Sequence, residues 1–347
     1  MLGCLRDFKY AVKKGERMKP KIWVTLSEDN YRKYLTPASE KKLRSLGEVI
    51  ESRKINPDAK KEAELIAEAA VVITCRGGYK LSPEQIKSAK NLKIVGVIGS
   101  AVRFVSPKTC YEKNIFVTNS AGGIGYTVAE YVVGVMITAL HRAFESMDHV
   151  REGKWSEGVP MGKDLQDKAV GLIGVGAVGG NVVKLLKPFT RNIKAYDPYL
   201  PKEAADGMGI ALTTKEDIIK NSDVISLHAG MTPETKNMIG QKEFEMMKPG
   251  VLIVNTARGG LIDHDAMLLA LKAGKIQAAL DVFEPEPLPV ESEYRKVKNC
   301  YPTAHTPGMT IDAAKREGGQ VVDDVELVLA GKKPLNNITK EKLARMT

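Results

Sequence analysis

Short apolar runs alternate with longer helical patterns along most of this chain. In the first part, apolar runs at 21–25, 69–75, 91–98 and 115–118 predict strands, and 39–46 has the pattern of a polar helix. The runs lead into loops of glycine and small polar residues. Strands that alternate with helices indicate a parallel α/β sheet, in which ligands lie beyond the carboxyl ends of the strands.

A second α/β unit is expected further along the chain. Its strands are predicted at 170–173, 193–197, 223–227, 251–255 and 276–281, and 300–305 ends the unit. Helical patterns lie at 241–247 and 263–273, the second followed by Gly274 as a C-cap.

Two helices are expected to connect or flank these units. A long helix over 125–150 is apolar on more than one face, so it is either a core helix that links domains or a subunit interface. A loop at 152–164, carrying Trp155, follows it. The segment 311–330 predicts a helix that packs back on the first unit.

The turn after the strand at 170–173 carries the first chemical signal. It reads Gly174-x-Gly176-x-x-Gly179, opens a helical pattern, and is followed by a strand that ends at Asp197. In a dinucleotide site the first glycine makes the turn, the second admits the pyrophosphate and the third lets the helix approach the strand. Asp197 would bind the adenosine ribose and repel a 2′-phosphate, which favours NAD(H) over NADP(H). The alternative is a βαβ turn whose glycines serve packing alone.

Three polar residues follow later strands of the same unit, where parallel strands bring their carboxyl ends together. Arg258 would hold a carboxylate with its planar guanidinium, or simply tie down a loop. His305 suits proton transfer near neutral pH, or is satisfied by backbone. Glu286, between two prolines, would orient the imidazole, or is a solvated loop acid. His228, at the end of another strand, is either loop structure or cofactor lining.

Composition narrows the classes of protein. The 347 residues suffice for two domains, and 43% hydrophobic with 27% charged residues is typical of a soluble globular protein. No apolar run is expected to reach the roughly 20 residues that span a bilayer, so no membrane partner is predicted. Cys4, Cys75, Cys110 and Cys300 are scattered, which predicts no disulfide framework or metal site and a cytoplasmic location.

The net charge of +10 suits either an anionic partner or a generally lysine-rich surface. No basic residues run five in a row, and aromatic residues make up only 6% of the chain. These observations favour the second interpretation and make nucleic acid an improbable partner.

From about residue 70 to 320 the sequence resembles the D-isomer-specific 2-hydroxyacid dehydrogenases. The motifs that carry the resemblance are Gly-Leu-Ile-Gly-Val-Gly-Ala-Val-Gly (171–179), Met-Thr-Pro-Glu-Thr (231–235), Asn-Thr-Ala-Arg-Gly-Gly-Leu-Ile-Asp (255–263), Ala-Leu-Asp-Val-Phe-Glu-Pro-Glu-Pro (279–287) and Thr-Ala-His-Thr-Pro-Gly-Met-Thr (303–310). The last three, in this order, are highly specific.

The resemblance implies a role for each site residue. Arg258 binds the substrate carboxylate and carbonyl, His305 is the acid/base, and Glu286 rather than Glu284 is its partner. Asp281 looks like the residue that bonds the nicotinamide carboxamide. Backbone N–H groups near Arg76, Gly77 and Gly78 are implied to meet the substrate carboxylate, and residues implied to bind NAD are Ser100, Gly174, Gly176, Ala177, Val178, Gly179, Asp197, Thr256, Ala257, Asp281 and Gly308.

The resemblance also implies the architecture. It predicts two doubly wound parallel-sheet α/β domains: a flavodoxin-like substrate domain formed by 21–120 and 306–347, and an NAD-binding Rossmann domain over 121–305. Residues 1–20 would be an N-terminal extension. Family members are usually dimers built through the long helix and the loop after it, so a homodimer is expected.

The chain departs from the family pattern at two places. Ala304 stands where the family commonly has proline before the histidine, which should loosen the approach to His305. Arg103 and Phe104 replace a polar pair that lines the cleft, so the substrate side chain is left open. We expect an NAD-dependent dehydrogenase of a small 2-hydroxy acid, or a 2-oxo acid reductase. The alternatives are an NAD-sensing regulator or corepressor on the same scaffold, a formate dehydrogenase, and a structural nucleotide-binding protein.

Overall fold

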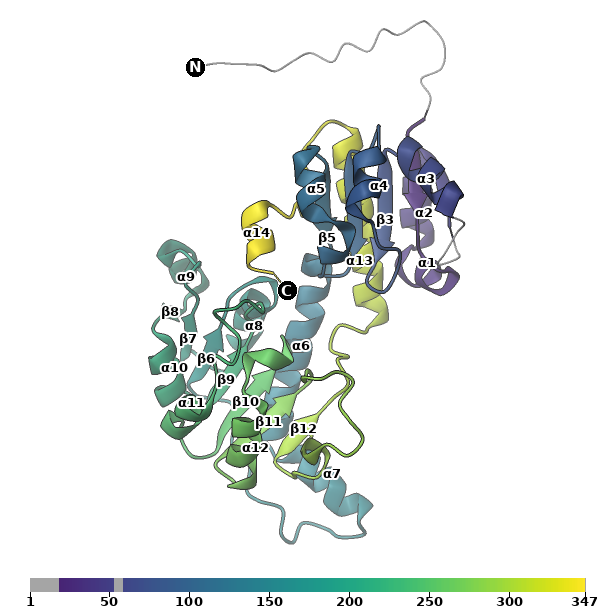
Figure 1. Cartoon of the computed structure of the whole chain (residues 1–347). Coiled ribbons are helices and arrows are strands. Elements are labelled where there is room, and N and C mark those ends of the chain that lie inside the picture. Colours follow the sequence, from purple (N-terminus) through teal and green to yellow (C-terminus); the bar gives the residue numbers. More distant parts are fainter. Residues whose placement is uncertain (1–18, 53–58, 347) are drawn as a thin grey trace, which may run out of the picture.

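Two α/β units, each built on one parallel sheet, make up the computed structural model, which describes residues 19–52 and 59–346 (Figure 1). Residues 1–18, which include Cys4 and nearly all of the predicted N-terminal extension, lie outside the described residues. Both units are doubly wound, as the sequence predicted.

The first unit has the strand order β2-β1-β3-β4-β5, with every pair parallel. This is the flavodoxin-like order. Strand β2 was not predicted, because its sequence, Glu-Val-Ile-Glu, lies at the sheet edge and is only partly buried. The elements are β1 (Lys21–Val24), α1 (Glu28–Tyr34), α2 (Pro37–Leu46), β2 (Glu48–Glu51), α3 (Ala59–Glu68), β3 (Val71–Cys75), α4 (Pro83–Ser88), β4 (Ile94–Ile98), α5 (Pro107–Glu112) and β5 (Phe116–Asn119).

The second unit has the order β12-β11-β10-β9-β6-β7-β8, again all parallel. The order reverses at β6, which pairs with both β7 and β9, so the glycine turn after β6 opens at the switch point where ligands bind in such sheets. The elements are β6 (Val170–Ile173), α8 (Ala177–Leu186), β7 (Ile193–Tyr196), α9 (Lys202–Met208), β8 (Ala211–Leu212), α10 (Lys215–Asn221), β9 (Val224–Leu227), α11 (Gln241–Met246), β10 (Val251–Asn255), α12 (His264–Lys272), β11 (Ile276–Leu280) and β12 (Cys300–Pro302).

The helix predicted over 125–150 is two helices, α6 (Ala121–Leu140) and α7 (Ala143–Arg151). The break falls at Arg142, whose backbone is left-handed with φ of 57°. Its guanidinium donates to Glu145 at 2.9 Å and to Gln277 at 2.6 Å. These contacts hold the kink, and the apolar pattern of the sequence does not register it.

Helix α6 runs between the two units (Figure 1). Its 20 residues are apolar enough to cross a bilayer by length and composition alone, which corrects the expectation that no apolar run is that long. However, 56% of its most apolar window is buried inside the protein, and the helix packs closely on α8 and α13. In this structure α6 is therefore a core helix that joins the units.

Helix α13 (Ile311–Leu329) packs on the sheet of the first unit, far from its neighbours in sequence. Val321, Val322 and Val325 join the buried cluster over β1, β3 and β4. Gly96 in β4 allows this approach, because a Cβ there would lie 2.7 Å from Val321 Cγ1. The chain then returns along β5 and ends its described part with α14 (Lys340–Ala344).

Candidate active site

The glycine turn after β6 has the geometry of a phosphate cradle. Gly174 has φ of +93°, and a Cβ there would lie 2.8 Å from the carbonyl carbon of His228. A Cβ on Gly179 would lie 2.4 Å from Gly174 O, so this glycine lets α8 pack against the turn. Around Gly176 no atom lies within 4 Å of the Cβ position, so its backbone faces open space at the start of α8. A helix N-terminus with exposed backbone suits a pyrophosphate.

Asp197 closes this turn from the end of β7. One carboxylate oxygen accepts the N–H of Val175 at 2.8 Å, and the other accepts the N–H of Tyr199 at 2.8 Å. Each oxygen keeps a second lone pair. Asp197 therefore fixes the loop and remains able to accept ribose hydroxyls.

Asp281 follows β11 and is almost fully buried, at 2% exposure. Its Oδ1 accepts the hydroxyl of Thr303 at 2.6 Å and the N–H of Thr306 at 3.0 Å, whereas the buried Oδ2 has no hydrogen-bond partner. Burial raises the pKa of Asp281, and the bonds from Thr303 and Thr306 oppose this shift. A buried acceptor without a partner fits a donor such as a nicotinamide carboxamide N–H, because leaving it unpaired is costly.

Two residues that sequence reasoning missed bear on the Asp281 site. Tyr131, from α6, bonds the hydroxyl of Thr303 at 2.9 Å, and Thr303 takes part although the proline expected beside it is replaced by Ala304. Thr256 was expected to bind the cofactor, and its hydroxyl, like Asp281 Oδ2, is buried without a partner.

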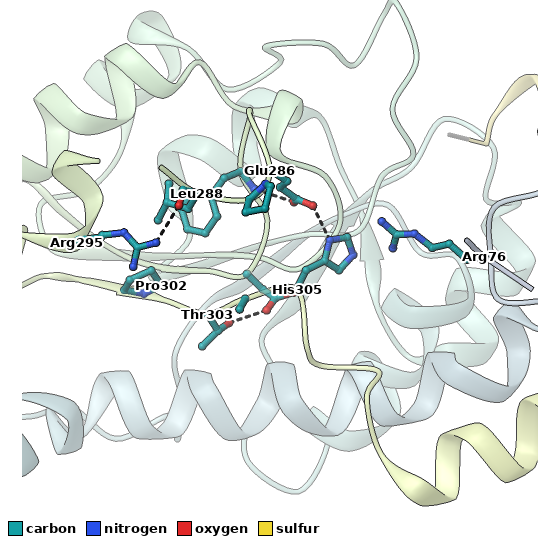
Figure 2. A pocket seen from close by; sticks show the side chains of 11 residues that line it. Arg76, Glu286, Leu288, Arg295, Pro302, Thr303 and His305 are labelled. Carbon is teal, nitrogen blue, oxygen red and sulfur yellow. Dashed lines mark hydrogen bonds and ion pairs between the residues drawn. The ribbon is translucent and has the colours of Figure 1, made fainter. Parts of the chain in front are cut away.

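His305 and Glu286 form the central pair of the site. His305 Nδ1 lies 2.8 Å from Glu286 Oε2, and Glu286 Oε1 accepts the N–H of Phe283 at 3.0 Å. Burial alone would raise the pKa of Glu286, but the bonds from His305 and Phe283 outweigh it and lower that pKa. His305 has left-handed backbone, with φ of 56°, and its N–H donates to Asp281 O at 3.0 Å. Figure 2 shows its ring between Glu286 and Arg76.

Arg258 stands on a loop that the sequence shapes for this purpose. The side chain of Asn255 accepts the N–H of Ala257 at 3.0 Å and donates to Arg258 O at 2.8 Å. Gly259 lets the loop press against the one that carries Glu286, since a Cβ there would lie 2.2 Å from the carbonyl carbon of Phe283. Burial and the repulsion of Arg76 lower the pKa of Arg258, and Glu286 opposes this shift.

Arg76 contributes to the site differently from the expectation. Its backbone N–H donates to Ile98 O at 3.3 Å, and that of Gly78 donates to Cys75 O at 2.9 Å, so both are used within the fold. The Gly77 N–H, at φ of 77°, is the donor of this loop that remains a candidate for substrate. The side chain of Arg76 points toward His305 from the opposite unit (Figure 2).

A cavity of about 510 Å³ between the units brings most of the predicted residues together. Predicted residues that line it are Arg76, Ser100, Ala177, Val178, Thr256, Ala257, Arg258, Asp281, His305 and Gly308. A second cavity, of about 560 Å³, shares Arg76, Asp281 and His305 with the first and adds Glu286. Lys33 and Glu317 also line the first cavity; they stand on helices distant in sequence and carried no local signal.

His228 also lines the first cavity. Its Nε2 lies 2.9 Å from Ser226 Oγ, and burial lowers its pKa to about 4. A neutral imidazole of this kind serves as cofactor lining.

Arg103 and Phe104 do not line either cavity, which corrects the expectation that they do. Phe104 packs against the core of the first unit. Arg103 donates to the carbonyls of Leu343 at 3.2 Å and Met346 at 2.7 Å, just past the end of α14. The departure from the family pattern at these positions therefore leaves the substrate contacts unchanged.

Fold and site together define a dinucleotide-binding α/β protein with an acid/base pair at the mouth of the cofactor groove. The family model for the D-isomer-specific 2-hydroxyacid dehydrogenase NAD-binding domain matches residues 133–307. The chain belongs to this family.

Two relatives and one solved structure illustrate the similarity. A D-3-phosphoglycerate dehydrogenase of Methanocaldococcus jannaschii is 36% identical over 317 residues, 89% of this chain, and the chain spans only 60% of that relative's length. A hydroxypyruvate reductase of Thermotoga maritima is 35% identical over 258 residues, covering 73% of this chain and 83% of the relative. The crystal structure of a Thermus thermophilus protein superposes with a TM-score of 0.73 at 27% identity, covering 92% of this chain and all of that one.

Proposed function

We propose that this protein is an NAD-dependent oxidoreductase that transfers hydride between NAD(H) and C2 of a small D-2-hydroxy acid or 2-oxo acid. The observation that carries the proposal is the 2.8 Å pair of His305 and Glu286 at a cavity that also holds Arg258 and Asp281. The similarity to named dehydrogenases and reductases supports it. The same similarity does not favour an NAD-sensing regulator.

The chain's own residues suit the cofactor. The turn of Gly174 and Gly176 would hold the pyrophosphate, Asp197 the adenosine ribose, and the free Oδ2 of Asp281 the carboxamide. NADH, when bound, supplies the hydride for the 2-oxo acid. A carboxylate at the ribose repels a 2′-phosphate, so NAD(H) is the proposed cofactor.

The substrate would be oriented and protonated by three residues. Arg258 presents two parallel donors that match a carboxylate or an adjacent carbonyl. His305, held by Glu286 through Nδ1, keeps its other nitrogen for the substrate oxygen, to which it gives a proton in reduction and from which it takes one in oxidation. Glu286 stabilises the protonated imidazole because an opposite charge favours the charged form.

Positive charge beyond Arg258 bears on the class of substrate. Arg76 and Lys33 both line the substrate side of the first cavity. Two cations in addition to Arg258 favour a 2-oxo acid with a second anionic group, such as a phosphate. One relative is named for a phosphorylated substrate and another for hydroxypyruvate, so the two classes are the ones to compare.

A homodimer is proposed as the working assembly. Helix α7 and the loop after it carry exposed apolar side chains, with Val150 at 53%, Trp155 at 72% and Met161 at 93% exposure. Contiguous exposed apolar surface is typical of an interface. Sedimentation of the full chain measures this directly, and a monomer at all concentrations would refute it.

The test of the proposed function is a screen of NADH oxidation over 2-oxo acids. Glyoxylate, hydroxypyruvate, phenylpyruvate and 3-phosphohydroxypyruvate vary the side chain and its charge. We expect turnover with at least one of them, and a higher kcat/KM for the phosphorylated acid than for hydroxypyruvate. NADH binding without turnover of any 2-oxo acid would instead support a regulator.

A further inference from the structure

The segment 338–346, which contains α14, is anchored on the first unit. Ile338 and Leu343 are buried in the core of that unit, and the Ile338 N–H donates to Val117 O at 2.8 Å. Thr339 caps the helix by accepting the N–H of Lys342. At the other end the Arg103 guanidinium binds the carbonyls of Leu343 and Met346, which are left without partners within the helix.

The same segment reaches the second unit at two points. The Arg345 guanidinium lies over the ring of Tyr199, with its carbon 4.0 Å from the ring centroid. The Arg345 carbonyl approaches Gly230 so closely that a Cβ on Gly230 would lie 2.4 Å from it. Figure 1 shows α14 between the two units, next to α8.

Both contact points flank the place proposed for adenosine. Tyr199 donates its N–H to Asp197, the carboxylate proposed for the ribose. Gly230 follows β9, the strand beside the glycine turn. The segment therefore lies across the adenosine end of the groove, on the side facing the first unit.

Arg345 and Met346 line the cavity of about 510 Å³ together with Ala177 and Val178. The space beside them stays open. The segment is thus a wall of the cofactor groove, and it does not fill it.

We propose that Arg345 is a cofactor-binding residue that the first unit contributes to the adenosine end of NAD(H). A guanidinium stacks on flat rings and pairs with phosphate oxygens, and both groups are present at this end of the cofactor. Arg103 is a positioning residue, since it holds the segment that carries Arg345. The inference rests on the proposed use of NAD(H).

The test compares Arg345→Ala with Lys340→Ala in the full chain. Lys340 is an exposed cation on the same helix that lines no part of this cavity, so its variant controls for charge. Dissociation constants for NADH, from its fluorescence, and for ADP-ribose, from calorimetry, are measured without substrate. We expect Arg345→Ala to weaken both ligands by about two- to fivefold, the range for a cation on a ring at an exposed site. Lys340→Ala should leave both constants unchanged.

Two other results would overturn the proposal. Equal constants for Arg345→Ala and the parent chain would leave Arg345 without a role, and tighter binding would make the segment an obstruction. Arg103→Ala provides a second measurement: it should weaken NADH similarly, and adding Arg345→Ala to it should cause little further loss. Additive losses would contradict the positioning role. If the parent chain binds NADH and turns over no 2-oxo acid, the proposed reaction fails while the Arg345 comparison still holds.

Discussion

Glu286 Oε2 lies 2.8 Å from His305 Nδ1, although the two residues follow different strands of the sheet. The second oxygen of Glu286 is held by the Phe283 N–H, so the carboxylate has one orientation. This arrangement commits Nδ1 and leaves the other ring nitrogen on the side of Arg76 (Figure 2). The predictions below follow from this pair and from the groups around it.

Glu286→Gln keeps the shape of the side chain and removes its charge. The pKa of Glu286 is lowered in the fold, so the parent carboxylate is ionised throughout the neutral range and favours the protonated imidazole. Reduction needs that proton, so activity is lost as the pH rises. In the variant we expect the loss to begin about one pH unit lower. The pH profile of kcat/KM for 2-oxo acid reduction measures this, and an unshifted profile would contradict the role of Glu286.

His305→Asn is the sharper test of the acid/base. At φ of 56° the backbone is left-handed, a conformation that asparagine tolerates better than alanine, so the variant avoids added strain. We expect kcat to fall by about 10²–10⁴-fold, the usual contribution of a positioned acid/base. NADH affinity, measured by fluorescence, should change little. Turnover near that of the parent would remove His305 from the mechanism.

Arg258→Lys retains a positive charge and loses the planar pair of donors. We expect kcat/KM for the 2-oxo acid to fall by about 10- to 100-fold, the range for hydrogen bonds to charged groups. The dissociation constant of NADH serves as the internal control, because the proposed contact is with substrate. An unchanged kcat/KM would refute the carboxylate clamp.

Asp281→Asn separates cofactor binding from stability. The variant keeps an oxygen for the bonds from Thr303 and Thr306, and places an amide where the unpaired Oδ2 lies. Burial raises the pKa of Asp281, so the ionised carboxylate is unfavourable in the fold above that pKa, and its removal should not lower the Tm of the cofactor-free protein. NADH should bind about tenfold or more weakly. A lower Tm with unchanged NADH affinity would assign Asp281 a structural role alone.

Asp197→Asn tests the choice of cofactor. Asparagine retains an acceptor for the N–H of Val175 or Tyr199, whereas alanine would free both and disturb the turn. Removing the charge should reduce the preference for NADH over NADPH by about tenfold, since like charges a few ångströms apart cost on the order of 1 kcal/mol or more. The ratio of kcat/KM for the two cofactors measures this. A constant ratio would reject the ribose assignment.

Much of the site was predictable because its signals are local. The glycine spacing after β6 depends on backbone conformation and close approach within a few residues, and Gly174 and Gly179 have the environments that the spacing predicts. Arg258, Glu286 and His305 follow β10, β11 and β12, which lie side by side in the sheet. Parallel neighbouring strands present their carboxyl ends at one edge, so strand order alone brings the three loops together.

The sequence by itself determined the two α/β units, the glycine turn and the acid/base pair, because periodicity and turn chemistry act over short stretches of chain. Only the tertiary structure decided the break of the long helix at Arg142, the use of Arg103 to hold α14, and the unpaired oxygen of Asp281. Arg103 and Met346 are bonded although they lie 243 positions apart. Contacts of this kind arise from the packing of whole elements, and local patterns do not encode them.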